Sequence, residues 1–192
     1  MFLVSRPSQN EIEQYLKDSQ SLPLSYEPGL LAREIPRGFK IDEASGLLGY
    51  GKPAFELARR ALSEWKHFDL GWVELFPRNA PIEPGTVVAV LIRHVVIWSL
   101  NGCRVLYLAG EGESDGTFGF AYDTLTNHGE IGEERFSVEF YHDSGEVWYD
   151  LYAFSKPAEL LAKIGYPVSR YLQKAFARDS KTAMFNFVSQ QG

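Results

Sequence analysis

Consecutive β-strand patterns in the second half of the chain constrain the fold more than any other part of the sequence. Over residues 117–125, Phe118, Phe120 and Tyr122 alternate with small or acidic residues. This two-residue period is typical of a strand with one buried face. A second strand, predicted over residues 133–140, has a largely apolar face made by Glu134, Phe136, Val138 and Phe140. Both segments therefore predict half-buried strands of an antiparallel sheet.

The predicted sheet extends on both sides of these two strands. After a turn at residues 143–145, the aromatic-rich residues 147–154 predict a strand that Pro157 ends, because proline cannot donate to a ladder. Upstream, strands are predicted over residues 72–76, 87–100 and 104–109, with a hairpin at Asn101-Gly102. The segment 87–100 is apolar on both faces, so something must cover each side of it.

Helical patterns lie mainly at the two ends of the chain. Ser8 and Glu11 have the spacing of a capping box, which predicts a helix over residues 8–19. A stripe of apolar residues predicts a second helix over residues 53–67 and a long one over 166–188. We further expect a short strand at 30–35, a glycine-punctuated loop at 37–51 and a short helix at 158–164.

This order of elements predicts an α+β fold. Six strands in an up-and-down run, followed by one long helix, give a curved antiparallel sheet of about six to seven strands that wraps around the C-terminal helix. The N-terminal helices pack against the same sheet. At 192 residues the chain is predicted to be a single domain over residues 1–192.

Composition argues against several classes of function. With 19 Lys and Arg against 25 Asp and Glu, the net charge is −6, which disfavours nucleic acid as a partner. Cys103 is the only cysteine, so an intramolecular disulfide is impossible, and we expect neither a metal site nor a cofactor. The longest apolar run, residues 86–100, is too short for a membrane-spanning helix. We expect a soluble, cytoplasmic protein.

A series of short motifs occurs in order along nearly the whole chain: Phe2-Leu3, Arg6-Pro7-Ser8, Pro36, Gly38-Phe39, Trp65, Phe68, Gly71-Trp72, Gly119-Phe120-Ala121-Tyr122, Thr124-Leu125, His128, Gly132-Glu133-Glu134-Arg135-Phe136, Val147-Trp148-Tyr149, Ala153-Phe154-Ser155, Pro157, Gln173 and Phe176. In these motifs the sequence resembles the uncharacterised DUF1990 family of bacteria and plants. Two positions depart from the family pattern, which usually has glycine at Asp123 and often proline at Gly129.

The resemblance implies a fold but not an activity. The order of strands and helices is similar to the helix-grip fold of the START-like (SRPBCC) superfamily, whose members often bind lipids, sterols or polyketides between sheet and helix. A fold does not by itself determine a function.

One short segment carries most of the candidate chemistry. His128, Glu130, Glu133, Glu134 and Arg135 lie within eight positions, which suits a general acid/base pair, a His/carboxylate metal site, or a solvated loop with an ion pair at the strand end. A metal site is disfavoured, because no second histidine has a ligand spacing. Because Glu134 shares a face with Phe136, it is the better candidate for a pocket, and Arg135 points the other way unless a bulge intervenes.

Three further side chains admit both a structural and a functional interpretation. Tyr122 either orients a ligand or satisfies a buried polar group. His94 lies on an apolar strand face and is expected to be a core or interface histidine. Asp150 must be paired or hydrated. It could be a polar anchor in an aromatic-walled cavity, or it could form an ion pair with Arg170 or Arg178 of the last helix.

Three functions are compatible with these patterns. The first is a binding module for a small hydrophobic, lipid-like molecule, with a cavity lined by Trp98, Phe120, Tyr122, Glu134, Phe136, Trp148, Asp150 and Tyr152, and with Glu134 or His128 at its mouth. The second is an enzyme that uses His128 with Glu133 or Glu134 as catalytic acid and base on an apolar substrate. The third is a homodimer in which a second subunit covers the strand at residues 87–100.

Overall fold

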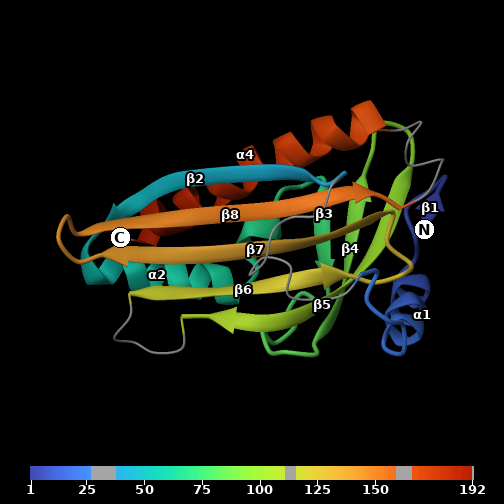
Figure 1. The fold of residues 1–192 in the computed structure, drawn as a ribbon, viewed down its shortest axis with the longest axis horizontal. Coiled ribbons are helices and arrows are strands. Elements are labelled where there is room, and N and C mark those ends of the chain that lie inside the picture. Colours follow the sequence, from blue (N-terminus) through green and yellow to red (C-terminus); the bar gives the residue numbers. More distant parts are fainter. Residues whose placement is uncertain (27–37, 111–115, 159–165, 192) are drawn as a thin grey trace.

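The computed structural model describes residues 1–26, 38–110, 116–158 and 166–191 (Figure 1). Its main feature is one antiparallel sheet with the strand order β2-β8-β7-β6-β5-β4-β3, and the short β1 pairs with β5. The strands are β1 (Phe2–Leu3), β2 (Lys40–Tyr50), β3 (Val73–Phe76), β4 (Val87–Arg93), β5 (Trp98–Ala109), β6 (Thr117–Thr124), β7 (Glu130–Tyr141) and β8 (Glu146–Pro157).

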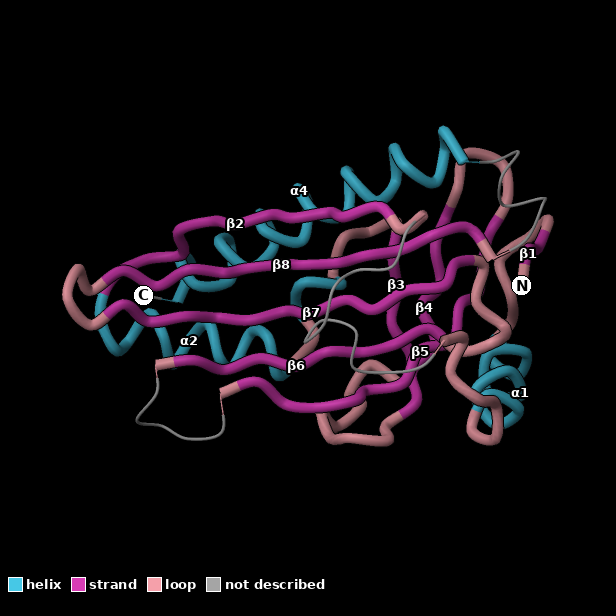
Figure 2. Tube along the Cα trace, in the orientation of Figure 1, coloured by secondary structure: helices cyan, strands magenta, loops and turns pink. Residues whose placement is uncertain are grey.

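The helices lie on the two sides of this sheet. They are α1 (Gln9–Ser19), α2 (Gly51–Ser63), the 3₁₀-helix η2 (Lys66–Phe68) and α4 (Tyr166–Gln191). Figure 2 shows α2 and α4 behind the long strands, with α1 at the end near β1. We call the face of the sheet that packs against α2, η2 and α4 the inner face, and the opposite one the outer face. The predicted α+β sheet wrapped around a C-terminal helix is confirmed.

The apolar core has two parts. The larger part fills the inner face, where Phe120, Phe136 and Tyr149 pack with Leu62 of α2 and Met184 of α4. The smaller part lies under α1, and its members are Ile12, Tyr15, Phe76, Ala89, Leu91 and Leu100. The fold thus buries apolar side chains on both sides of β4, as its two apolar faces require.

Helix α1 provides the cover for the outer face of β4. Its capping box is formed, with the Ser8 backbone N–H donating to Glu11 Oε2 at 2.7 Å and the Glu11 N–H donating to Ser8 Oγ at 3.4 Å. Ile12 is fully buried against the smaller core. The strand face that suggested a second subunit is therefore covered by a helix of the same chain.

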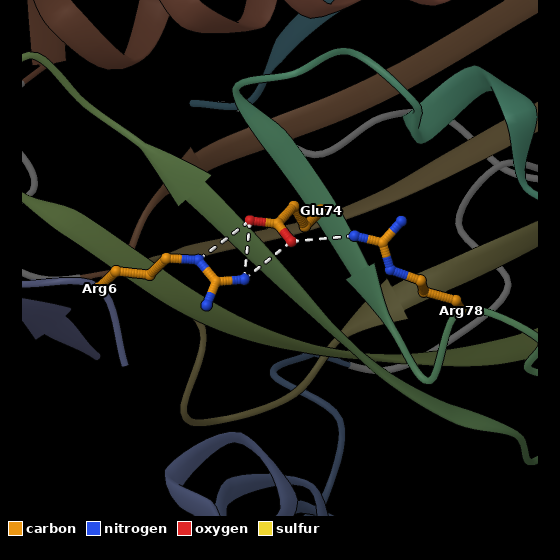
Figure 3. Close-up of polar contacts among 3 residues, drawn as sticks. All are labelled: Arg6, Glu74 and Arg78. Atoms are coloured by element: carbon orange, nitrogen blue, oxygen red, sulfur yellow. Dashed lines mark hydrogen bonds and ion pairs between the residues drawn. The ribbon is translucent and has the colours of Figure 1, made fainter. Parts of the chain in front are cut away.

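The N-terminal segment is also tied to the sheet. The terminal amino group of Met1 donates to the carbonyl of Leu100 at 2.8 Å. Figure 3 shows the carboxylate of Glu74, on β3, between Arg6 and Arg78, at N–O distances of 2.9 and 3.2 Å. Exposed pairs of this kind contribute about 0–1 kcal/mol each, so they orient the segment more than they stabilise it.

The predicted strand over residues 87–100 is wrong, and so is the hairpin at Asn101-Gly102. The chain turns earlier, where the His94 N–H donates to the Ile97 carbonyl at 2.8 Å, and Asn101 and Gly102 lie inside β5 opposite Val90 and Ala89. A side chain at position 102 would displace Asn127, because a Cβ there would lie 2.6 Å from Asn127 Oδ1. This glycine therefore permits close packing and does not form a turn.

The loop predicted over residues 37–51 is also wrong, because residues 40–50 form β2, paired with β8. The glycines in this segment suggested a loop, but Gly46 serves packing: a Cβ there would lie 2.3 Å from Lys181 Cδ of α4. A glycine inside a strand often marks such a close approach. The strand β2 therefore forms the edge that α4 covers.

The remaining helix predictions differ from the structure mainly in their ends. The second helix ends at Ser63 and not at residue 67, and Trp65 adopts a left-handed backbone (φ 57°) before η2. The indole of Trp65 donates to the Ala80 carbonyl at 2.8 Å, which holds this conformation. The predicted strand at 30–35 and nearly all of the predicted helix at 158–164 lie outside the described residues.

Candidate functional site

A cavity of about 170 Å³ lies between the inner face of the sheet and α4, and it is partly open to solvent. Most of its wall is apolar. The apolar side chains come from strands on both halves of the sheet, from η2 and from α4, and they include Phe68, Trp72, Val90, Ile92, Leu151, Leu172 and Phe176. The curvature of the sheet therefore leaves a space that the C-terminal helix does not fill.

Glu134 and Tyr122 form the central polar contact of the cavity. They face each other across β6 and β7, and the Tyr122 hydroxyl donates to Glu134 Oε2 at 2.6 Å. Burial raises the pKa of Glu134 to about 7; the hydrogen bond from Tyr122 opposes this rise, and the charges of Asp42 and Glu130 add to it. Glu134 lies deep in the fold but keeps some accessible surface because it faces the cavity.

A second set of polar contacts connects α4 to the strands that border the cavity. Gln173 Nε2 donates to Glu130 Oε2 at 2.6 Å and to Ser155 Oγ at 2.8 Å. Beside it, Arg170 Nη2 donates to Asp42 Oδ1 at 2.7 Å. Burial raises the pKa of Glu130, while its hydrogen bonds lower it. These contacts connect the helix to both β2 and β7.

Two histidines that the sequence singled out border the cavity, and both have polar partners. The Glu130 N–H donates to His128 Nδ1 at 2.9 Å, so the proton of the neutral ring lies on Nε2. Burial lowers the pKa of His128 to about 3. His94 Nε2 lies 2.8 Å from Ser99 Oγ, and burial lowers its pKa as well. Both rings are therefore neutral at physiological pH.

Glu133 holds its carboxylate on the outer face, although it also borders the cavity. Tyr26 and Tyr107 donate to its two oxygens at 2.7 and 3.0 Å. Asp123 faces Glu133 on the neighbouring strand β6; its Oδ1 accepts from the Thr124 N–H at 2.9 Å, and its Oδ2 has no hydrogen-bond partner among the described residues. We call Tyr26, Tyr107, Asp123 and Glu133 the outer cluster.

The two carboxyl groups of the outer cluster are buried, with Asp123 0% and Glu133 2% exposed. Burial raises the pKa of Asp123 to about 8, and the charge of Glu133 adds to the rise. Asp123 was not among the predicted site residues. The signal that could have revealed the pair is strand register, because Asp123 and Glu133 occupy facing positions of β6 and β7.

Several residues predicted to line the cavity lie elsewhere. Trp148, Asp150 and Tyr152 alternate along β8 with the core residues Tyr149 and Leu151, so they lie on the outer face. The aromatic residues on both faces of β8 made the inner face ambiguous from the sequence. Asp150 has Ser45 as its hydrogen-bond partner and not an arginine of α4.

Three other predicted aromatic residues also lie outside the lining. Trp98 packs beside the smaller core, under Arg93. Phe120 and Phe136 are fully buried on the inner face, where Phe136 contacts Phe68 with 5.8 Å between ring centroids. These two rings therefore support the cavity wall from behind.

The predicted acid/base cluster is divided between the two faces of the sheet. Glu134 and His128 border the cavity, whereas the Glu133 carboxylate is held on the outer face. Cys103 is buried, and burial raises its thiol pKa well above the usual range, so it is protonated. Within the described ranges, no group of three or more His, Cys, Asp or Glu side chains could hold a metal ion.

Comparison with known proteins places this chain in a family. The sequence profile described as "Domain of unknown function (DUF1990)" matches residues 25–183. The chain belongs to the DUF1990 family. A UPF0548 protein of Dictyostelium discoideum is 36% identical over 207 residues, which cover 98% of this chain and 96% of that protein. The resemblance inferred from the sequence is confirmed.

Solved structures of low sequence identity share the fold of this DUF1990 chain. TTHA0849 from Thermus thermophilus matches with a TM-score of 0.54 at 9% identity, over 80% of this chain and 99% of that one. Norcoclaurine synthase of Thalictrum flavum, in complex with a transition-state analogue, matches with a TM-score of 0.50 at 9% identity, over 82% and 99%. In the part of the chain that the structure describes, no helix is long and apolar enough to cross a bilayer.

Proposed function

We propose that this protein is a binding module for a small hydrophobic molecule, held in the cavity between the inner face of the sheet and α4. One observation carries the proposal: the walls of the cavity are mostly apolar, yet they contain the carboxyl group of Glu134. Among the described residues, the hydrogen-bond partner of this carboxyl group is Tyr122 alone. Binding pockets typically combine mostly apolar walls with a small number of polar groups that orient the ligand.

The size of the cavity limits the ligand. Pockets for drug-sized molecules usually have volumes of roughly 300–1,000 Å³, whereas this cavity has about 170 Å³. We therefore expect a small molecule, or one end of a longer molecule whose remainder extends through the open side. Norcoclaurine synthase, which shares the fold, holds a transition-state analogue, so this architecture can accommodate a small molecule.

A second candidate function is proton-transfer catalysis by Glu134. A general acid or base works best when its pKa lies near the working pH, and the pKa of Glu134 is about 7. Tyr122 would orient the carboxyl group, and His128, neutral and bonded to the backbone, would contribute no charge. Turnover of a bound molecule by the wild type but not by Glu134→Gln would favour this function over simple binding.

The binding proposal can be tested by native mass spectrometry of the purified chain and by NMR titration with hexanol. A matched pair of variants localises the site: Ser169→Trp places an indole in the cavity wall on α4, and Ser189→Trp makes the same change at an exposed position of that helix. We expect Ser169→Trp to abolish binding and Ser189→Trp to leave it unchanged. Equal binding by both variants would refute the proposal.

A further inference from the structure

The cavity has an unusual balance of charge. Four of the residues that line it are acidic, namely Asp42, Glu130, Glu133 and Glu134, and none of the described lining residues is lysine or arginine. The two lining histidines are neutral. Any molecule that enters therefore meets carboxyl groups and aromatic rings, without a cationic group in the wall.

The four carboxyl groups differ in how they are compensated. Asp42 is paired with Arg170, and the two oxygens of Glu133 accept from tyrosines on the outer face. Glu130 accepts from the neutral amide of Gln173. Glu134 accepts only from the hydroxyl of Tyr122 among the described residues. The cavity thus contains two carboxyl groups, those of Glu130 and Glu134, whose hydrogen-bond donors are neutral.

We propose that the ligand of this cavity is a small hydrophobic amine that binds as its ammonium ion, with the charged nitrogen beside Glu134 and the apolar part against Phe68 and Phe176. This inference rests on the proposed binding function and specifies its ligand class. Carboxylate and phosphate ligands are disfavoured, because they would add like charge beside Glu130 and Glu134, and the described lining contains no lysine or arginine.

The walls of the cavity favour a cation for a second reason. Three aromatic rings lie in this wall, and the ring centroid of Phe68 is 5.1 Å from that of Phe176 and 6.2 Å from that of Tyr122. The faces of such rings attract ammonium groups, most strongly where water is excluded. The free-energy cost of burying the Glu134 carboxyl group is incurred when the protein folds and not when a ligand binds. An ammonium ion that enters the cavity therefore supplies a counter-charge without a further desolvation cost for Glu134.

The inference makes binding dependent on pH. Since the pKa of Glu134 is about 7, its ionised fraction rises about tenfold from pH 6 to pH 8, while an alkyl ammonium stays charged. The titratable groups that interact electrostatically with Glu134 lie on β2 and on β5 to β8: Asp42, Cys103, Tyr122, Glu130 and Tyr149. Helix α4 contributes Arg170, which is paired with Asp42. Glu130, whose pKa is also raised, changes in the same direction.

The experiment is isothermal titration of the full chain with hexylamine, hexanol and hexanoate, which share an apolar chain and differ in the head group. We expect hexylamine to bind most tightly, with an affinity about tenfold higher at pH 8 than at pH 6. Glu134→Gln should remove the preference for the amine and most of the pH dependence, because Glu130 still titrates in this variant. Glu139→Gln, the same change on the outer face of the same strand, should leave both intact.

The outcomes separate this inference from the proposed function. If hexanol binds as tightly as hexylamine, or if hexylamine binds more tightly at pH 6 than at pH 8, the cavity binds hydrophobic molecules but the ammonium inference is wrong. If hexanoate binds best, the charge argument is wrong. If none of the three binds to the wild type, the binding function itself fails.

Discussion

Two neighbouring residues of β7, Glu133 and Glu134, have similar partners on opposite faces of the sheet. Each is a buried carboxyl group that accepts a hydrogen bond from tyrosine. On the outer face, two tyrosines and a second carboxyl group, Asp123, surround Glu133. On the inner face, Glu134 has one tyrosine partner and an open cavity in front of it.

The difference shows that a buried carboxyl group does not by itself mark a binding site. In the outer cluster the oxygens of Glu133 are occupied by donors from the same chain, so the cluster is suited to holding residues near Tyr26 on the sheet. In the cavity, space remains beside the carboxyl group for an external partner. If the outer cluster is structural and the cavity is functional, substitutions in the outer cluster should reduce stability more than substitutions at the cavity.

The largest expected effect follows from removing the donors of the outer cluster. The double substitution Tyr26→Phe/Tyr107→Phe leaves the buried Glu133 carboxyl group without its described donors. Hydrogen bonds to charged groups contribute about 1.5–3 kcal/mol each, so the free energy of unfolding should fall by about 3–6 kcal/mol. Urea denaturation at pH 7 measures this change. A loss below about 1 kcal/mol would mean that the cluster does not stabilise the fold.

The next effect concerns the pH dependence of stability. Because the pKa of Asp123 is raised from 3.8 to about 8, the folded chain keeps a proton that the unfolded chain releases between these values. Stability therefore falls as pH rises through this window, by about 1.4 kcal/mol per pH unit for one group. Asp123→Asn should remove a decline of about 3 kcal/mol between pH 5 and pH 7. Denaturation midpoints of both proteins across that range test the prediction.

A control for this pH experiment is Asp150→Asn, because Asp150 lies on the outer face of β8 and is only partly buried. Its own pKa is raised by burial, in the same direction. We expect it to change the slope less than Asp123→Asn does. Equal slopes for the wild type and Asp123→Asn would show that Asp123 is not protonated in the folded chain.

A smaller effect on stability is expected on the inner face. Tyr122→Phe removes one hydroxyl from a cavity that admits solvent, so the free energy of unfolding should fall by only about 0.5–1.5 kcal/mol. The pKa of Glu134 should rise above 7, because the bond from Tyr122 lowers it. Carbon-13 NMR titration of the glutamate carboxyl groups measures the shift. If Tyr122→Phe lowers the free energy of unfolding as much as the outer double substitution does, the proposed difference between the two faces is wrong.

The smallest effect is expected for Glu139→Gln, at a half-buried position on the outer face of β7. Its carboxylate accepts from Tyr141 at 2.9 Å, an exposed contact that the amide oxygen of glutamine can replace. The free energy of unfolding should change by less than about 0.5 kcal/mol, as measured by urea denaturation. A larger loss would show that carboxyl groups of β7 stabilise the sheet even outside the outer cluster and the cavity.

Much of this architecture could be predicted from the sequence. The alternation of Phe118, Phe120 and Tyr122, and of Glu134 with Phe136, correctly predicted which side chains of β6 and β7 share a face, because the period of a strand is a local property of the backbone. The capping box at Ser8 and the length of the last helix were predicted for the same reason. The up-and-down order of β3 to β8 and the fold class followed from these elements, whereas β2 at the edge beside β8 was not predicted.

Features that depend on contacts between distant residues could not be predicted in this way. Glycines 46 and 102 suggested a loop and a turn, whereas each makes room for a side chain far away in the sequence. The inner face of β8 was ambiguous because aromatic residues occupy both of its faces, and only the packing of Tyr149 against α4 decides it. The register of β6 on β7 brought Tyr122 to Glu134 and Asp123 to Glu133. Local periodicity thus determined the faces, while tertiary packing and register decided which face encloses the cavity and which carboxyl group lies in it.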